Sequence, residues 1–307
     1  MNISEIIGKS THPFPSIEIV PPLKGISKDE LLSSIEPMLE YAPKYINVTC
    51  HRSEFEFVPN ADGSFAKRMV RSRVNEVAVA AAIMSRYQVE VVPHIICAGV
   101  GKDQIQTTLD DLNFLGIHNV MALRGDCLSS EKRFTPNPHG YAHADELVRG
   151  IRDYRKEDGE VFCIGVGGYP EKHFESPNIE TDIMYLKQKV DAGANYIITQ
   201  MFFDNERFYA FERLCRQAGI TVPIIPGLKP LSTQRQTTLL PEAFSLDIPF
   251  ELSSAVMQAK SPAEIYQIGQ DWCTKQCRDL LQHGVKAIHF YTMGQARNVC
   301  EILRNCF

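Results

Sequence analysis

The sequence lacks the segments that would take a protein into or across a membrane. No run of about 18 uncharged apolar residues occurs in the 307 residues, so we expect no membrane-spanning helix. The N-terminus, MNISEIIGKSTHPFPS, has no basic region followed by an apolar core and a small-residue cleavage site. These absences predict a cytoplasmic protein that does not interact with membranes.

The sequence also lacks an excess of positive charge. Its formal net charge is -5, its pI is about 6.0, and charged residues make up 22% of the chain. Proteins that bind nucleic acid or anionic membranes usually carry a basic surface, because the attraction is electrostatic. We therefore expect neither partner.

Paired cysteines are missing as well. The nine cysteines are scattered and form no C-x-x-C pair, which argues against a disulfide framework and against a zinc knuckle. Cys273 and Cys277 lie four apart in a helical pattern and could share a metal ion. Two such cysteines without nearby histidines are also what helix packing produces, and we predict no metal site.

The glycine-rich signatures of nucleotide-binding loops are absent too. GVG at 99–101 and GVGG at 165–168 both follow β-rich runs, but neither has the third glycine of G-x-G-x-x-G. An open, doubly wound sheet would normally carry that motif after its first strand. This alternative is therefore disfavoured, and any nucleotide-like cofactor must be held in another way.

The chain does contain eight short β-rich runs. Most are continuously apolar, as strands are when both faces of a parallel sheet are covered. The runs are SIEIV (16–20), YINVTC (45–50), EVVPHIIC (90–97), NVMALRGD (119–126), FCIGVGGYP (162–170), YIITQMFF (196–203), VPIIPGL (222–228) and AIHFYTM (287–293).

Helical patterns separate these runs. A capping-box pattern begins the first helix at residues 27–30, and most of the later helices end on the glycine that commonly follows a helix. The others are expected at 70–88, 103–116, 143–159, 179–194 and 205–219, with room for several more in 229–286. Regular alternation of eight strands with helices predicts an α/β fold, a (β/α)8 TIM barrel. No linker or composition break divides the chain, so we predict a single domain over 1–307.

Polar residues stand near the ends of almost all of the predicted strands. In barrel enzymes the chemistry is carried by the C-terminal ends of the strands and the loops that follow them. The residues are Glu18, Thr49, His94, Arg124, Gly125, Asp126, Tyr169, Gln200, Tyr291 and Thr292. Their convergence on one rim predicts a binding or catalytic site.

Each of these residues also has a purely structural explanation. Glu18 could form a salt bridge at the barrel mouth, and His94 could be a core histidine hydrogen-bonded to the backbone. Arg124 and Asp126 could pair with each other. Thr49 and Gln200 could be internal hydrogen-bonding residues, and the tyrosines could serve packing.

Several stretches together resemble the methylenetetrahydrofolate reductase family. They occur in order along essentially the whole chain: IEIVPP (17–22), VTCH (48–51), PHIIC (93–97), ALRGD (122–126), GYPEKH (168–173), LKQKVDAGANYIITQMFFD (186–204), PIIPGL (223–228) and HFYTM (289–293). The resemblance implies a barrel that contains FAD and reduces 5,10-methylenetetrahydrofolate to 5-methyltetrahydrofolate with NADH or NADPH. It implies a role in one-carbon metabolism and methionine biosynthesis, and an extent like that of the shorter bacterial members, which are often homo-oligomers.

The resemblance also implies roles for individual residues. Glu18 matches the general acid, and Asp126 matches an aspartate near both the flavin and the pterin. The implied flavin-binding positions are Thr49, His94, Arg124, Gly125, Asp126, Tyr141, Ala142, Tyr169, His173, Asp182 and Lys189. The implied substrate-binding positions are Glu18, Asp126, Gln200, Gln236 and Gln295. Asp182 and Lys189 lie seven apart on one helix face, although charges on a helix are also commonly just solvated.

Departures from the family pattern occur at a few positions. Gln295 stands where many members have an arginine near the folate tail, with Arg297 two positions later, and Tyr185 and Gln188 replace residues that are polar or basic in some relatives.

Two other classes of function remain open. A flavin-independent barrel lyase or aldolase would need a glycine-rich phosphate loop after the last two strands, where PGLKPLST offers one glycine and a lysine. The second class is a non-catalytic folate- or flavin-binding subunit.

Overall fold

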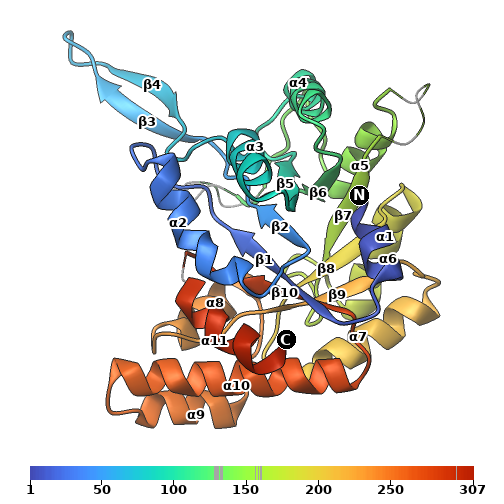
Figure 1. Cartoon of the computed structure of the whole chain (residues 1–307). Coiled ribbons are helices and arrows are strands. Elements are labelled where there is room, and N and C mark those ends of the chain that lie inside the picture. Colours follow the sequence, from blue (N-terminus) through green and yellow to red (C-terminus); the bar gives the residue numbers. More distant parts are fainter. Residues whose placement is uncertain (128–130, 132–133, 156, 158, 160, 295) are drawn as a thin grey trace.

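The computed structural model describes residues 1–127, 131, 134–155, 157, 159, 161–294 and 296–307. Within these ranges eight parallel strands close into a barrel, each pairing with its neighbours in chain order (Figure 1). They are β1 (Phe14–Ile19), β2 (Tyr45–Val48), β5 (Glu90–Ile96), β6 (Asn119–Leu123), β7 (Cys163–Gly168), β8 (Tyr196–Met201), β9 (Ile224–Leu228) and β10 (Ala287–Tyr291). The predicted (β/α)8 fold class and all eight predicted strands are confirmed.

Helices connect the strands and surround the barrel (Figure 1). Those that follow the strands are α2 (Lys28–Leu39), α3 (Glu76–Tyr87), α4 (Lys102–Phe114), α5 (Ala144–Arg152), α6 (Ile179–Asp191), α7 (Asn205–Gln217), α8 (Gln236–Phe244), α9 (Phe250–Gln258), α10 (Pro262–Gln282) and α11 (Ala296–Cys306). The long connection after β9 thus holds three helices, as expected. No helix in the described ranges combines the length and apolar character needed to cross a membrane.

The helices begin and end where local hydrogen bonding favours it. The Ser27 hydroxyl accepts a hydrogen bond from the backbone N–H of Glu30 at 3.1 Å, and the Asn178 side chain caps α6 in the same way. Gly116, Gly193 and Gly219 have positive φ angles just after α4, α6 and α7. Because only glycine adopts this conformation at little cost, these residues terminate the helices that precede them.

The N-terminal helix α1 (Ile3–Lys9) covers one end of the barrel. Ile3 and Ile7 are buried against a cluster that includes Tyr45 and Val92, and the Ile3 N–H donates to the Asn119 side chain at 3.0 Å. Since α1 packs against the N-terminal ends of the strands, ligands can reach the barrel from the opposite, C-terminal end.

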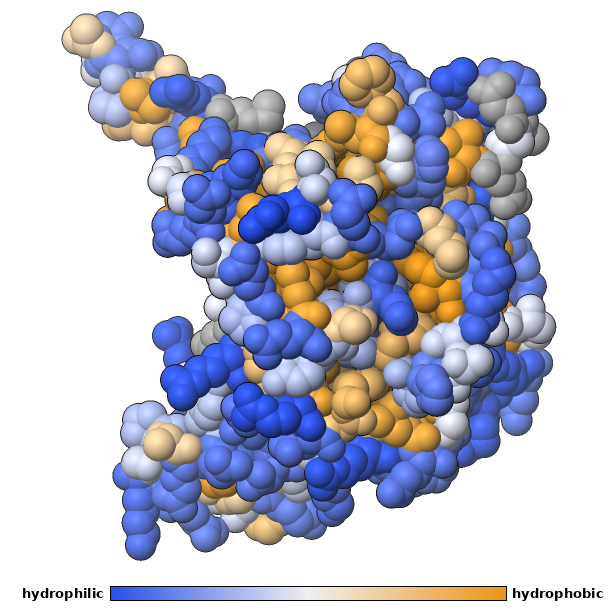
Figure 2. All heavy atoms as spheres, in the orientation of Figure 1, coloured by the Kyte–Doolittle hydropathy of each residue, from blue (hydrophilic) through white to orange (hydrophobic). Residues whose placement is uncertain are grey.

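A β-hairpin between β2 and α3 was not expected. The segment predicted as helix at 70–88 is helical only from Glu76, because Phe65–Val70 forms β4 and pairs antiparallel with β3 (Glu54–Pro59). The hairpin projects from the body in Figure 1, and the space-filling outline is hollowed beside it in Figure 2. The sequence EFEFV alternates with period two and leads to an Asp62–Gly63 turn, which is a hairpin signal that the strand prediction did not include.

The position of α10 against the loop after β9 depends on a glycine. A Cβ atom at Gly269 would lie 1.9 Å from the carbonyl oxygen of Leu231, which is backbone and cannot rotate away. We expect Gly269→Ala to lower the free energy of unfolding by roughly 3 kcal/mol, because α10 must shift. Thermal and urea unfolding would measure the loss.

Gly8 in α1 provides the matched control, since a Cβ there would meet no atom within 4 Å. Gly8→Ala should leave stability unchanged or raise it slightly. Equal unfolding midpoints for Gly269→Ala and the unmodified protein would contradict the packing argument.

Candidate active site

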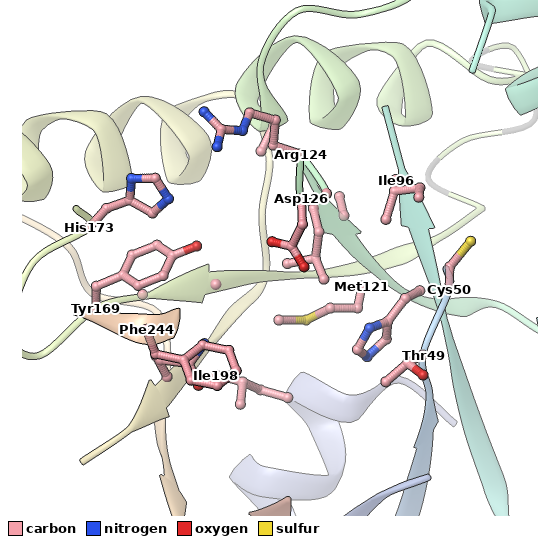
Figure 3. Close-up of a pocket in the computed structure, with 18 of the residues that line it drawn as sticks. Thr49, Cys50, Ile96, Met121, Arg124, Asp126, Tyr169, His173, Ile198 and Phe244 are labelled. Atoms are coloured by element: carbon pink, nitrogen blue, oxygen red, sulfur yellow. The ribbon is translucent and has the colours of Figure 1, made fainter. Parts of the chain in front are cut away.

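A deep cleft of about 990 Å³ opens at the C-terminal end of the barrel. Most of the residues expected at the site line it: Glu18, Thr49, His94, Arg124, Gly125, Asp126, Tyr169, His173, Asp182, Lys189 and Gln200. Figure 3 shows several of them, with Tyr169 and His173 on one wall and Thr49 across the cavity. Residues from six different strands or their loops thus face one space.

Three of the expected residues are not among those that line the cleft, and a fourth cannot be placed. Tyr141 packs against Gly150, and the Ala142 N–H donates to Glu146 at 2.9 Å, so neither lies among the residues that line the cleft. The Gln236 side-chain oxygen accepts from the Ser232 N–H at 2.7 Å, at the start of α8 and away from that lining. Gln295 lies outside the described residues.

Glu18 lies between two imidazole rings. Its Oε2 atom is 3.7 Å from Nε2 of His94 and 3.8 Å from Nε2 of His289, and its side chain is 14% exposed. The Thr292 hydroxyl donates to the backbone carbonyl of Glu18 at 2.7 Å, which holds β1 against the end of β10. The backbone of Glu18 is therefore held in place, and its carboxyl group lies beside the two rings and is partly open to the cleft.

His94 is a buried, neutral ring. Burial is the main reason that its pKa falls from 6.5 to about 4, and the nearby Glu18 only partly opposes this shift. Its Nε2 atom lies 3.3 Å from Oδ1 of Asn47, which accepts the hydrogen bond. The Nδ2 group of Asn47 is left without a partner among the described residues, although Asn47 is buried.

The low pKa of His94 predicts a loss of stability in acid. Below about pH 6.5 the unfolded chain takes up a proton at this residue, whereas folded His94 takes it up only near pH 4. The unfolded state therefore binds more protons in this window, and stability falls as the pH falls. When the pH is lowered from about 7 to about 4.5, the free energy of unfolding of the unmodified protein should fall. In His94→Asn we expect this fall to be smaller by about 2 to 3 kcal/mol.

Urea unfolding at the two pH values tests this expectation. His139 is exposed, and His139→Asn serves as the control for replacing a histidine by asparagine. The same acid-induced loss in His94→Asn and in the unmodified protein would show that His94 does not take up its proton in this way.

The two charged side chains of the Arg-Gly-Asp sequence after β6 point in different directions. Arg124 forms its ion pair with Glu175, and its guanidinium lies 4.5 Å from the ring centre of Phe134. Figure 3 shows the Asp126 carboxylate on the cleft side, toward the Tyr169 hydroxyl. Burial, Asp182 and Asp126 together raise the pKa of Tyr169 to about 12. Within the described chain Arg124 and Asp126 do not pair with each other.

The glycine between them has a structural reason of its own. Gly125 has a φ of +86°, and a Cβ atom there would lie 2.9 Å from Cβ of Ala98. Glycine thus allows the loop after β6 to turn sharply while it packs against the end of β5.

Asp182 and Lys189 lie on the side of α6 that faces the cleft. The Ser176 hydroxyl donates to Asp182 at 2.7 Å, and the Lys189 ammonium donates to the carbonyl of Gly167 at 2.6 Å. Burial lowers the pKa of Lys189 to about 8, which Asp182 partly opposes. Neither side chain is therefore a freely solvated helix charge.

His51 lines the cleft and feels the charges of two carboxylates. Burial and Arg73 lower its pKa, whereas Glu18 and Asp126 oppose the shift, so both carboxylates lie within electrostatic range of this ring. Thr49 contacts the His51 Nε2 atom at 3.0 Å.

On another part of the lining, the Gln200 side-chain oxygen accepts from the Met201 N–H at 2.9 Å, which leaves its amide nitrogen for a ligand.

Sequence analysis missed three polar residues around this centre. Ser16 and His289 hydrogen-bond at 3.0 Å below Glu18, and Asn47 contacts His94. A signal was available, because side chains two apart in a strand point the same way. Counting back two positions from Glu18, Thr49 and Tyr291 reaches Ser16, Asn47 and His289, one layer deeper in the barrel.

No metal centre emerges from the described part of the chain. Among those residues, no three histidine, cysteine or acidic side chains are grouped so that they could hold an ion. Cys273 and Cys277 are both buried in α10.

Comparisons with known proteins place these observations in a family. Residues 3–306 match the family described as "Methylenetetrahydrofolate reductase". The chain is 31% identical to "Methylenetetrahydrofolate reductase (NADH) 1" of Arabidopsis thaliana over 94% of its own length, but it spans only 48% of that plant protein. It is also 31% identical to the "5,10-methylenetetrahydrofolate reductase" of Escherichia coli, covering 92% of this chain and 86% of the bacterial protein.

Solved structures with low sequence identity share the fold. A protein from Clostridium thermocellum that "binds two copies of 5-methyl-5,6,7,8-tetrahydrofolic acid" aligns over 99% of this chain and 98% of its own, with a TM-score of 0.60 and 12% identity. A 2,3-dimethylmalate lyase aligns over 98% of this chain and 82% of its own, with a TM-score of 0.53 and 12% identity. At such identities the likeness shows the barrel alone.

Proposed function

The chain belongs to the methylenetetrahydrofolate reductase family, and from this premise we propose that it reduces 5,10-methylenetetrahydrofolate to 5-methyltetrahydrofolate with FAD and a nicotinamide dinucleotide. The observation that carries the proposal is the gathering of Glu18, Asp126 and Gln200 around one cleft at the open end of the barrel. The two substrates would use the site in turn, the nicotinamide leaving before the folate enters.

The size and lining of the cleft support the proposal of a flavin dinucleotide. Its volume of about 990 Å³ lies at the upper end of the range of roughly 300 to 1,000 Å³ for ligand pockets. Its walls offer aromatic rings at Tyr169 and His173, and the buried Nδ2 group of Asn47 has no described partner. A large planar ligand with hydrogen-bonding edges fits such a donor and acceptor set.

The residues that would hold FAD lie on two sides of the cleft. Tyr169, His173, Asp182 and Lys189 form one wall, Arg124 lies beside them, and Thr49 and His94 come from β2 and β5. When bound, FAD supplies the chemistry of accepting a hydride from NADH or NADPH and passing it to the folate carbon.

Glu18 is proposed to donate the proton that opens the five-membered ring of the substrate. Reduction needs this ring to open into an iminium cation, and opening requires a proton on the departing nitrogen. The carboxyl group lies close to His94 and His289, and its partial exposure leaves it within reach of the substrate. Because His94 is neutral near pH 7, it adds no competing positive charge beside the iminium.

Asp126 is proposed to stabilise the cation. The carboxylate is exposed to the cleft and forms no ion pair within the described chain, so its charge is available to a cationic substrate. Gln200 is proposed to hydrogen-bond the pterin, because its oxygen is already held by Met201 and its amide nitrogen can act as a donor. The three residues thus supply a proton, an anion and an orienting contact.

The lyase alternative finds little support around the loop after β9. The phosphate grip that it requires would draw on Lys229, but this residue is only 4% exposed and donates to the carbonyl of Pro230. Lys229 is not among the residues that line the cleft.

The visible spectrum of the purified protein tests the proposal most directly. We expect flavin absorbance that bleaches on addition of NADH or NADPH and returns on addition of 5,10-methylenetetrahydrofolate. If no flavin survives gentle purification and added FAD does not bind, the proposal fails. Bleaching without any turnover of methyltetrahydrofolate in the presence of an electron acceptor would instead favour a non-catalytic flavin-binding subunit.

A further inference from the structure

Two thiols from different helices meet where α11 packs against α10. Figure 1 shows these helices side by side. Cys277 lies in α10, Cys306 is the last residue of α11, and a hydrogen bond joins their side chains. The Cys306 sulfur also lies 3.8 Å from the carbonyl oxygen of Thr274, one turn before Cys277 on the same face of α10. The two sulfurs are therefore in contact although they are far apart in the sequence.

The two thiols differ in their access to solvent. Cys277 is fully buried in the hydrophobic core, whereas Cys306 is partly exposed. A small solute can therefore reach the sulfur of Cys306 but not that of Cys277. An accessible cysteine beside a second thiol is the arrangement in which one sulfur is oxidised first and the other then bonds to it.

The surroundings of Cys306 favour its thiolate form. The hydrogen bond with Cys277 is the main reason that the pKa of Cys306 is lowered, and Arg278 acts in the same direction, although burial opposes both. The Arg278 guanidinium donates to the carbonyl of Asn305 at 3.2 Å, which keeps its charge beside Cys306. The same hydrogen bond, together with burial, raises the pKa of Cys277. Because the thiolate is the reactive form of cysteine, Cys306 is the nucleophile of the pair.

We propose that Cys306 is a site of oxidation by peroxides and that Cys277 then closes a disulfide with it. The Cys306 thiolate attacks one oxygen of hydrogen peroxide, the O–O bond breaks and hydroxide leaves, so that a sulfenic acid forms. The Cys277 sulfur attacks the sulfenic sulfur, the S–O bond breaks, and the departing hydroxide takes the Cys277 proton to form water. Together the two sulfurs lose two electrons, and the peroxide is reduced to a hydroxide ion and a water molecule.

The first step prepares the second. Oxidation of Cys306 removes its negative charge, and with it the hydrogen bond and the repulsion that raise the pKa of Cys277. The buried thiol can then release its proton as it attacks. Neither cysteine lines the cleft, so the proposal does not depend on the proposed reaction of flavin and folate.

Mass spectrometry of reduced protein treated with hydrogen peroxide tests the proposal. After the remaining thiols are blocked, we expect peptides joined by a Cys277–Cys306 disulfide, lighter by two hydrogen atoms than the reduced pair. Cys277→Ser should stop at a sulfenic acid that dimedone labels at Cys306, and Cys306→Ser should leave Cys277 unmodified. Thermal unfolding would verify that both variants fold.

Arg278→Gln tests the same proposal without changing either sulfur. The side chain is exposed, so this variant should fold. Loss of the positive charge should slow disulfide formation several-fold at neutral pH, and a higher pH should restore the rate, because more of Cys306 is then thiolate. A rate and a pH dependence equal to those of the unmodified protein would overturn the activation of Cys306.

Cys300 provides the matched control. It lies on the same helix as Cys306, and burial and the nearby Glu40 raise its pKa. Cys300→Ser should therefore form the Cys277–Cys306 disulfide as fast as the unmodified protein. Oxidation spread evenly over the cysteines, a bond from Cys306 to Cys273, or a Cys306 sulfenic acid that persists beside reduced Cys277 would overturn the proposal.

Discussion

Glu18→Gln is expected to slow folate reduction by ~100 to 10,000-fold, the range for losing a general acid, and to leave bleaching of the flavin by NADH or NADPH unchanged. The proton is needed only to open the folate ring, so the nicotinamide half-reaction has no use for it. Glutamine keeps the size of the side chain and can still contact His94 and His289, which limits structural disturbance. Stopped-flow spectroscopy of the two half-reactions would measure both rates.

Glu54 offers a charge-matched control for this variant. It also lines the cleft, but it lies at the start of the hairpin, and Glu54→Gln should change neither half-reaction appreciably. Equal slowing of both half-reactions in Glu18→Gln would refute the assignment of Glu18 as the proton donor, because a shared loss indicates damage to the flavin site.

The barrel was predictable because its strands are buried on both faces. Eight continuous apolar runs separated by helical patterns leave few other arrangements, and the caps at Ser27 and Asn178 fix where two helices begin. The hairpin at 54–70 was missed because its alternating pattern is short and two-stranded. The predicted helix at 70–88 shares only its first residue with the hairpin, so residues 54–69 carried no predicted element.

The residues at the rim of the site could also be predicted from the sequence, whereas the side chains that they contact could not. Strand-end residues such as Glu18 and Gln200 can be found because barrel topology places all such ends together. The partners of Glu18 depend on closure of the barrel, since Ser16 and His289 are 273 positions apart in the chain. The contact between the thiols of α10 and α11 is likewise a tertiary property that no local pattern reveals.

Local hydrogen bonding explains the residues that fell outside the lining. Gln236 caps the start of α8 through Ser232, and the Ala142 N–H is held by Glu146 at the start of α5. In both cases the match to the family shows which residue stands at the position, but it does not show where its side chain or backbone N–H points. Whether these residues approach a bound ligand stays a prediction.

Asp126→Asn is expected to slow folate reduction without slowing reduction of the flavin by NADH or NADPH. A cation and an anion about 4 Å apart attract each other by roughly 4 kcal/mol at an effective dielectric constant near 20. Part of this attraction survives as a dipole interaction in asparagine, so we expect folate reduction to slow by roughly 10 to 1,000-fold. Bleaching by NADH or NADPH should be as fast or faster, because the carboxylate no longer opposes negative charge on the reduced cofactor. Stopped-flow rates and the flavin reduction potential would measure the two effects.

Asp145 provides a control that tests whether the effect of Asp126→Asn depends on the position of the carboxylate or only on the loss of a negative charge in the cleft. It also lines the cleft, but its carboxylate pairs with Arg149 at 2.9 Å, so its charge is already compensated. Asp145→Asn should therefore change both half-reactions far less than Asp126→Asn does. Glu18→Gln should leave the rate of flavin bleaching unchanged. Asp126→Asn should leave that rate equal or faster and should raise the reduction potential of the flavin. The flavin reduction potential therefore distinguishes the proposed proton donor from the residue proposed to stabilise the cation. An Asp126→Asn enzyme that reduces folate at the normal rate would remove Asp126 from the chemistry, whatever the result at Glu18.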